Sequence, residues 1–432
     1  MSPEELLGGV PMFELLKEKR ACRYMGGYAV SVFGTGFVYP LTAIYLDSVV
    51  GAATSEISLY FFLTGVCSFA IAPLSGMLSD RIGCESVGMG GIAFQALGSL
   101  LIAISSNFIV AVIGGMILGI GNGAFYGSQT SLLFRLFGKE RLSKVFAIQY
   151  IVMNVAVAAS GVAGGFVAST FGSAGFRTCY LFNSFSFIVY GTVLLHDLGR
   201  PQTEKREAKR DGESGEAGTN VLVILRGVIC TSFFKRVMLP LAIIQFIFAG
   251  FGFSQMDSVM PLVFVKYGSF DVGVAGLFLS SNCIAVVFFQ ARAEKYVEQF
   301  GKKNALALAA AIWCFASIFA VLAVIVFPNS LIGVLLICLY SIVFGVGETF
   351  VSPSVQPMIA ECAPEGYLGF CSATVNTMYS LGTTIGPALA LGMLTSHSCS
   401  GIWLTIFPML MIGALCARLV LKEEGCEAKM VR

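Results

Sequence analysis

The chain has 432 residues, of which 56% are hydrophobic and 12% are charged, and its formal net charge at pH 7 is +2. A soluble globular protein carries about 25% charged residues, so this composition excludes an ordinary water-soluble fold. Apolar runs of about twenty residues recur from end to end, and each is long enough to cross the roughly 30 Å hydrocarbon layer as a helix. The sequence therefore predicts a polytopic protein of the lipid bilayer.

Twelve membrane spans are predicted in chain order. An outer-membrane barrel is excluded because its strands would alternate polar and apolar residues over about ten positions. The predicted fold class is all-α, with twelve transmembrane helices in two pseudo-symmetric six-helix halves. The spans are 24–50, 57–78, 87–105, 108–131, 143–169, 176–196, 236–265, 272–291, 304–327, 330–353, 368–393 and 400–421.

The longest polar interruption, residues 196–220, is dense in charges and turn formers and separates six spans from six spans. Residues 221–235 fit either a short interfacial helix or an extension of the seventh span. Several transporter folds consist of two such halves with the substrate site between them, near the bilayer midplane. The predicted units are a cytoplasmic N-terminal segment 1–23, an N-terminal half 24–196, a cytoplasmic linker 197–235, a C-terminal half 236–421 and a cytoplasmic tail 422–432.

The positive charges predict the orientation. Of the 27 Lys and Arg residues, only Arg177 and Lys266 lie in segments that the even-numbered crossings place on the far side. Cytoplasmic loops carry the excess of Lys and Arg, so we expect both termini to face the cytoplasm from the plasma membrane. The N-terminal segment lacks a short apolar core followed by a cleavage site, and it does not resemble a removed signal peptide.

Several functions are disfavoured by missing motifs. The segments FGKE (137–140) and FGKK (300–303) lack the preceding glycine and the following Ser or Thr of a phosphate-binding loop, so an ATP-driven pump is not expected. Most of the 13 cysteines lie singly within predicted spans, and the two histidines lie near span ends. We therefore expect no metal, no cofactor and no enzymatic activity.

The strongest motif, GMLSDRIGCESVG, lies between the second and third predicted spans at residues 76–88. It resembles the loop signature of the major facilitator superfamily, a glycine followed four residues later by Asp-Arg-x-Gly. A glycine at its start permits close helix packing, and its charges at the membrane boundary can pair with neighbouring helix ends, which would make a conformational lock. The matching residues are Gly76, Asp80, Arg81 and Gly83.

This chain departs from that signature at Cys84 and Glu85, where the family usually has a basic pair, so the lock is expected to have a different partner. A degenerate echo with Gly301 occurs between the eighth and ninth spans, at residues 290–306. The echo gives weak support for a duplicated architecture.

Within the superfamily, residues 345–370, GVGETFVSPSVQPMIAECAPEGYLGF, resemble the tenth helix and following loop of twelve-span drug:proton antiporters. Residues 381–392 resemble the glycine-proline element of those exporters. The resemblance implies export of drugs or metabolites. Two departures affect the mechanism: Gly115 stands where many proton-coupled members have an arginine, and Gly161 stands where the antiporter element usually has proline.

Two acidic residues, Asp257 and Glu348, lie inside predicted spans. Ionisable groups there cost a few kcal/mol and are functional candidates by default. At about 1.5 Å per residue, Asp257 lies about 30 Å above the cytoplasmic start of its helix and Glu348 about 25 Å below the external start of its own. We expect two separately gated proton-coupling groups at different depths. The alternatives are that Asp257 caps or bends its helix and that Glu348 is a protonated acid bonded to backbone.

Further polar residues recur at helical spacing on the predicted spans. They either face a substrate cavity or join helices inside the bundle, and we favour the cavity for the first, fourth and seventh spans. An apolar pocket would also contain aromatic side chains. The cavity candidates are Thr35, Tyr39, Asn122, Tyr126, Gln129, Gln245, Gln255 and Phe248.

These observations together predict a monomeric secondary transporter that works by alternating access. Protons moving down their gradient would drive the efflux of a small amphipathic compound. Proton-coupled or facilitative uptake of a nutrient is the alternative. The expected partners are a small-molecule substrate, protons and the bilayer, with no nucleic acid.

Overall fold

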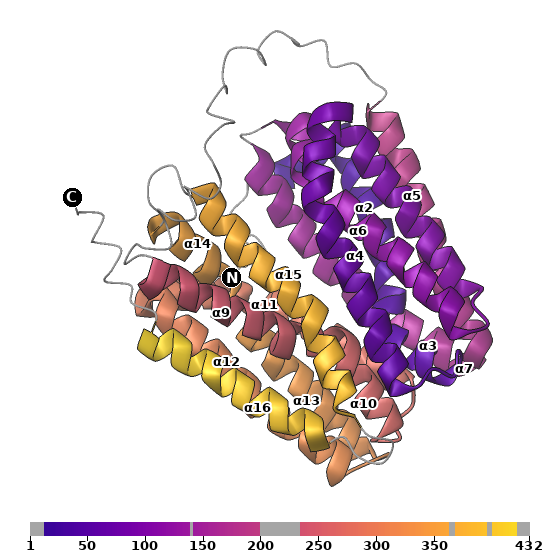
Figure 1. Ribbon diagram of the computed structural model, residues 1–432, viewed down its shortest axis with the longest axis vertical. Helices are drawn as coiled ribbons and strands as arrows, with labels where there is room; N and C mark the ends of the chain where they lie inside the picture. Colours follow the sequence, from indigo (N-terminus) through magenta and orange to yellow (C-terminus); the bar gives the residue numbers. More distant parts are fainter. Residues whose placement is uncertain (1–12, 139–140, 199–233, 363–367, 395–399, 421–432) are drawn as a thin grey trace.

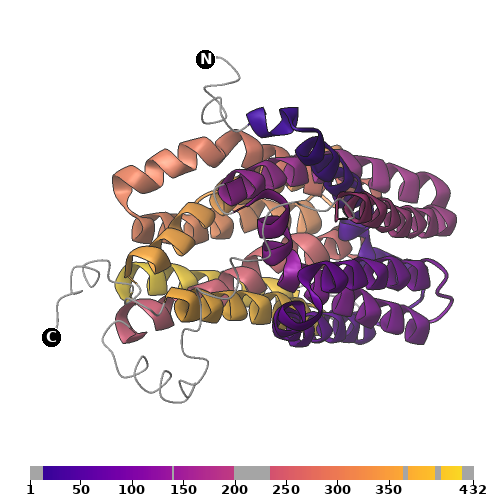
Figure 2. The ribbon, with the colours of Figure 1, turned by 90° about the horizontal axis from the view of Figure 1, so that it is seen from above.

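The computed structural model describes residues 13–138, 141–198, 234–362, 368–394 and 400–420, and within these ranges it contains helices and no strand. Figure 1 shows two groups of helices side by side, one formed by residues up to 198 and the other by residues from 234 onward. Figure 2 shows the same two groups from above. The predicted all-α fold class is confirmed, while the predicted linker and the segment 221–233 lie outside the described residues.

In the first group, successive long helices cross the molecule in alternating directions. The longest, α7, has 57 residues, but Gly172 has φ 54° and ψ −133° and divides it into two helices. These two helices correspond to the predicted fifth and sixth spans. The elements are η1 (Phe13–Lys17), α2 (Lys19–Val38), η2 (Tyr39–Leu41), α3 (Thr42–Ser48), α4 (Thr54–Ile82), α5 (Cys84–Ala103), α6 (Phe108–Phe137) and α7 (Leu142–Leu198).

The second group begins with a span made of several short pieces and continues with longer helices. Its elements are η4 (Phe234–Met238), α9 (Leu239–Phe248), η5 (Ala249–Phe253), η6 (Gln255–Val259), α10 (Met260–Lys266), α11 (Gly273–Phe300), α12 (Lys302–Ile325), α13 (Leu331–Glu348), α14 (Ser352–Cys362), α15 (Leu368–Gly392), α16 (Ser400–Leu415) and η7 (Cys416–Val420).

The helices are apolar enough to cross a bilayer. Nine stretches within the described part of the chain are long and apolar enough to be candidate membrane spans. Large apolar side chains such as Ile109, Phe166 and Leu331 face outward, as expected where the surroundings are lipid rather than water. The exact count of twelve spans stays a prediction.

Three predicted spans are interrupted. The first has a short 3₁₀ turn at Tyr39–Leu41, where Pro40 has no backbone N–H to donate. The seventh contains two wide π-helical turns, at 249–253 and 255–259. The tenth, predicted over 330–353, has a turn between the end of α13 at Glu348 and the start of α14 at Ser352. The whole stretch Leu331–Ile359 is long and apolar enough to be one candidate span.

The turn between α4 and α5 has the same form as the turn between α11 and α12. Gly83 has φ 93° and ψ 140°, and Gly301 has φ 86° and ψ 150°. Both values lie in a region that side chains other than glycine rarely adopt. The motif glycine and the glycine of its echo therefore play equivalent backbone roles in the two groups of helices.

Glycines hold α5 and α6 against each other. A Cβ at Gly98 would lie 2.5 Å from the Leu118 backbone nitrogen, and a Cβ at Gly121 would lie 2.6 Å from the Gln95 backbone nitrogen. Small residues allow two helix backbones to approach closely in a membrane. No side chain fits at these positions unless the helices move apart.

Gly98→Ala is expected to destabilise the fold by about 1–3 kcal/mol, the usual cost of overpacking a tight contact. Unfolding of the purified protein by SDS titration, followed by circular dichroism, measures this change. Gly90→Ala on the same helix is the matched control, since a Cβ there would have nothing within 4 Å. Equal stability of the two variants would contradict the close contact.

Candidate functional site

The two groups of helices contact each other through α4 with α15 and through α7 with α11. The Ser58 hydroxyl donates to the Ala388 carbonyl over 2.7 Å, and the Ser280 hydroxyl donates to the Ala158 carbonyl over 2.5 Å. A Cβ at Gly165 would lie 3.1 Å from the Gly273 carbonyl oxygen. Small and hydroxyl side chains therefore permit close backbone contact between the groups.

Charged residues join the groups at the end of the molecule that carries α3 and α10, called here the α3–α10 end (Figure 1). Lys266, at the end of α10, forms an ion pair with Asp47 of α3. The Ser169 hydroxyl donates to Asp271 over 2.8 Å. The two groups are thus tied together at this end by hydrogen bonds and an ion pair.

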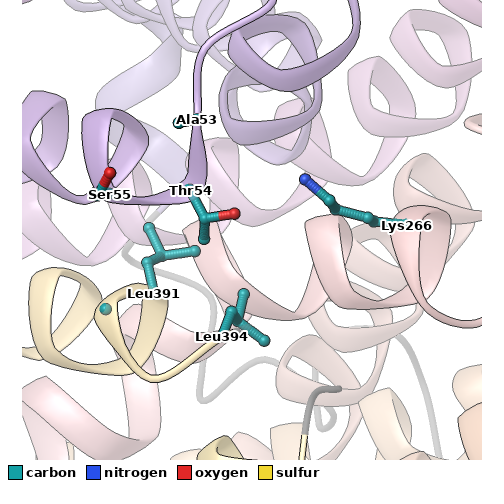
Figure 3. A pocket seen from close by; sticks show the side chains of 7 residues that line it. Ala53, Thr54, Ser55, Lys266, Leu391 and Leu394 are labelled. Carbon is teal, nitrogen blue, oxygen red and sulfur yellow. The ribbon is translucent and has the colours of Figure 1, made fainter. Parts of the chain in front are cut away.

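A pocket of about 420 Å³ opens at the same end, between the groups (Figure 3). The Lys266 side chain extends into it toward Thr54. Its lining consists of Ala53, Thr54 and Ser55 from the first group and Lys266, Leu391, Gly392 and Leu394 from the second. None of the intramembrane residues predicted from the sequence lines it.

Asp257 meets the first group at the two interrupted spans. The Tyr39 hydroxyl donates a hydrogen bond of 2.8 Å to Asp257 Oδ2. Tyr39 belongs to the 3₁₀ turn of the first span, and Asp257 belongs to a π-helical turn of the seventh. Tyr39 is also 43% exposed, so other side chains do not enclose this bond completely. Wide turns of this kind are frequent at functional sites.

Glu348 lies at the last residue of α13, where the tenth span is interrupted. The Asn282 amide donates to Glu348 Oε2 over 3.4 Å. A Cβ at Gly345 would lie 3.1 Å from that amide nitrogen, and a Cβ at Gly347 would lie 2.6 Å from the Trp313 ring. The two glycines in GVGE therefore admit the neighbouring helices α11 and α12 beside the acid.

The two acids hold different neutral partners, a hydroxyl for Asp257 and an amide for Glu348. The site therefore combines two carboxyl groups with a phenol from the first group of helices and an amide from the second. The predicted difference in depth stays a prediction.

The polar candidates on the first and fourth spans bond mainly to other helices. The Thr35 hydroxyl donates to the Ser31 carbonyl of its own helix over 3.1 Å and lies 3.5 Å from Asn183 Oδ1 of α7. Asn122 Oδ1 accepts from Gln95 of α5 over 2.8 Å. These bonds favour the helix-packing alternative for Thr35 and Asn122. Gln129 is half-buried on α6, and its role stays a prediction.

Tyr126 differs from its neighbours because it is 62% exposed. Its ring packs edge-on against Phe125 at 5.5 Å. The exposure leaves this tyrosine available to a solute, so its cavity role stays a prediction.

The candidates on the seventh span, apart from Asp257, are buried. Gln245 is 7% exposed and Gln255 is 1% exposed, and the Gln255 amide donates to the Gly250 carbonyl over 2.8 Å. Phe248 is fully buried and packs on Trp313 with ring centroids 4.9 Å apart. The structure places all three inside the second group, where they support the wide turns, and their predicted contact with substrate has no support here.

The superfamily motif differs from its expected packing. A Cβ at Gly76 would meet nothing within 4 Å, so the expectation that this glycine allows close packing is wrong for this structure. The Arg81 side chain is exposed, and that of Asp80 lies outside the described residues. Glu85, where the family usually has a base, forms an ion pair with Arg135 at the end of α6. Glu85, which departs from the motif, is thus paired with a residue of opposite charge.

The sequence did not identify Trp313 and Asn282 as parts of the site. Asn282 is a polar residue within a predicted span, and Trp313 is one of only two tryptophans. Polarity was the available signal for Asn282.

The glycine at position 115 has a spatial explanation. A Cβ there would lie 2.7 Å from the Thr64 hydroxyl oxygen, which leaves no room for the arginine of related proteins.

Two groups of apolar helices that meet around intramembrane carboxyl groups define a membrane transporter fold. The family model of the Major Facilitator Superfamily matches residues 24–339 and 269–429. The chain belongs to the major facilitator superfamily, which makes it a multi-pass membrane transporter.

Quinolone resistance protein NorA of Staphylococcus aureus is 23% identical over 383 residues, which cover 86% of this chain and 89% of that protein. The nucleoside transporter NupG has a similar structure, with a TM-score of 0.69, 15% identity, and coverage of 93% of this chain and 98% of that one. A bacterial homologue of the human lysosomal transporter Spinster, solved in an inward-facing and unoccupied conformation, has a TM-score of 0.70 and 11% identity, and the match covers 98% and 100% of the two chains. The solved structures show the shared fold.

The hydrogen bond between Tyr39 and Asp257 is expected to contribute about 1–3 kcal/mol to stability, as usual for a bond to a charged group. A double-mutant cycle with Tyr39→Phe and Asp257→Ala, measured by thermal unfolding in detergent, should show a coupling energy of that size. Tyr28→Phe, on the same helix, is the control and should show no coupling to Asp257→Ala. Additive effects of Tyr39→Phe and Asp257→Ala would contradict the bond.

Proposed function

We propose that this transporter exports small amphipathic compounds in exchange for protons, by alternating access between its two groups of helices. One observation carries the proposal: Asp257, an intramembrane carboxyl group, is bonded across the two groups of helices by the partly exposed Tyr39. A proton that binds or leaves there acts directly on the contact between the groups. Similarity to a quinolone resistance protein over most of the chain supports export.

The chemistry of the two acids suits proton coupling. A carboxylate is costly to hold against hydrocarbon and easily solvated in water. Asp257 and Glu348 each have one neutral hydrogen-bond partner, so neither is held permanently ionised by a bonded cation. Access to water from one side and then from the other would let each group bind and release a proton.

The described conformation corresponds to one of the two states that alternating access requires. Hydrogen bonds and the Asp47–Lys266 ion pair join the groups at the α3–α10 end. The positive-inside rule would place this end outside the cell, because Lys266 and Arg177 are the only two of the 27 Lys and Arg residues in the predicted segments on that side. In this orientation the chain faces the cytoplasm in a plasma membrane, ready to bind a compound for export, and both termini are cytoplasmic.

Uptake is the second candidate function. It is favoured by the structural neighbours, which include a nucleoside transporter. Both directions of transport use the same fold and the same acids. They differ in whether the compound moves with the proton or against it.

Reconstituted vesicles with an imposed pH gradient test the proposal. A panel of amphipathic compounds is followed together with proton flux, and we expect compound and protons to move in opposite directions. Glu348→Gln should abolish the proton-driven flux, because an amide cannot release a proton, and should leave exchange without a gradient intact. Glu298→Gln, an exposed acid near the end of α11, is the control and should behave as the unmodified protein.

Two outcomes would contradict the proposal. Movement of compound and protons in the same direction would show symport. Undiminished proton-driven export by Glu348→Gln would remove this acid from the coupling mechanism.

A further inference from the structure

Trp313 lies at the centre of the second group of helices. It is fully buried on α12. Its ring stacks on Phe344 at a centroid distance of 4.6 Å and an interplanar angle of 2°. Phe248 and Phe253 pack edge-on against it at 4.9 and 5.2 Å. Trp313 therefore contacts both the tenth and the seventh span.

The contacts fall where those two spans are interrupted. A Cβ at Gly347, next to Glu348, would lie 2.6 Å from Trp313 Cδ1. A Cβ at Gly252, in the π-helical turn that precedes Asp257, would lie 2.8 Å from Trp313 Cε3. One rigid ring thus rests against backbone beside each acid, and glycine is the residue that leaves room for it in both places.

The indole also forms a hydrogen bond to the turn that carries Glu348. Trp313 Nε1–H donates to the Phe344 carbonyl over 2.9 Å. This carbonyl lies four residues before Glu348, in the last turn of α13, so it is also the usual helical acceptor for the Glu348 amide. The bond fixes the end of α13 relative to α12.

Phe253 extends the contacts of the indole to a third span. It packs against Trp313 and also against Tyr379 of α15, at 5.9 Å. A shift of the indole would therefore also reach α15.

We propose that Trp313 is a positioning residue for proton coupling, which holds the turns of Asp257 and Glu348 at a fixed spacing. Trp313 contacts backbone atoms and aromatic rings, and it affects proton coupling through the two acids that it positions. The inference rests on the proposed function in that it assigns coupling to these two groups. Removal of the ring or its N–H would let the two turns move independently. The variant would still fold, but its proton coupling would be lost.

Trp403 provides a matched control in the same group of helices. It is also buried, at 7% exposure on α16, and its Nε1 has no hydrogen-bond partner among the described residues. Trp403→Phe removes the same atoms as Trp313→Phe without breaking a bond to the site. A purely structural role of tryptophan would give the two variants similar behaviour.

Vesicle transport gives the first test. Trp313→Phe is expected to lower proton-driven flux about tenfold, because displacement of positioned groups is costly, while exchange without a gradient changes little. Trp403→Phe should leave the ratio of the two fluxes unchanged. Equal losses of both fluxes in Trp313→Phe, or equal ratios in the two variants, would overturn the proposal.

A second test does not depend on transport. An apolar carbodiimide reacts with protonated carboxyl groups, and mass spectrometry of the purified protein measures its rate of attachment to Glu348. The rate should change several-fold in Trp313→Phe and match the unmodified protein in Trp403→Phe. An unchanged rate in Trp313→Phe would overturn the positioning role even if the proposed proton coupling were correct. Absent proton-driven flux in the unmodified protein would overturn the proposed function and leave this second test valid.

Discussion

Polar groups inside an apolar bundle need polar partners, because lipid offers none. The first, seventh and tenth predicted spans all break their regular α-helical hydrogen bonding at one point. At those breaks Tyr39 bonds Asp257, Asn282 bonds Glu348, and the Trp313 N–H bonds the last turn of α13. The interruptions and their partners therefore belong to one arrangement, and the carboxyl groups stay in the membrane because the neighbouring helices supply these bonds.

Glycines make this arrangement possible. Gly345 and Gly347 admit Asn282 and Trp313 beside Glu348, and Gly252 admits the other face of the same indole. Between the two groups of helices, Gly165 and its neighbours allow α7 to lie directly against α11. Small residues keep such contacts close without interlocking side chains, so the same surfaces are suited to a movement of one group against the other.

The sequence predicted the features that depend on local composition. Long apolar runs identified the helices, and isolated acids in those runs identified Asp257 and Glu348. The motif glycine Gly83 and its echo Gly301 both lie in turns that require glycine. The placement of Arg177 and Lys266 in far-side segments agrees with their location near the α3–α10 end, where Lys266 meets Asp47.

Other features depend on contacts between distant segments and could not be predicted in this way. Asn122 and Thr35 would show the same helical spacing whether they faced a cavity or a neighbouring helix. In the structure Asn122 bonds Gln95 of α5, and Thr35 lies 3.5 Å from Asn183 of α7. The interruption after Glu348 had a local signal, since Pro353 has no backbone N–H to donate to the Thr349 carbonyl. Trp313 matched an ordinary core residue until its contacts with the last turn of α13 and with the π-helical turn before Asp257 were visible.

The central claim is that protonation of carboxyl groups between the two groups of helices controls which end of the molecule is closed. Spin-label distances across both ends measure this directly, after replacement of the 13 native cysteines. One label pair is placed at Ser55 and Met393 at the α3–α10 end, and another at Lys144 and Lys295 near the opposite end. A change from alkaline to acidic pH should lengthen the first distance and shorten the second, and Asp257→Asn should abolish both responses. Distances that stay fixed, change in the same direction or respond equally in Asp257→Asn would contradict the account.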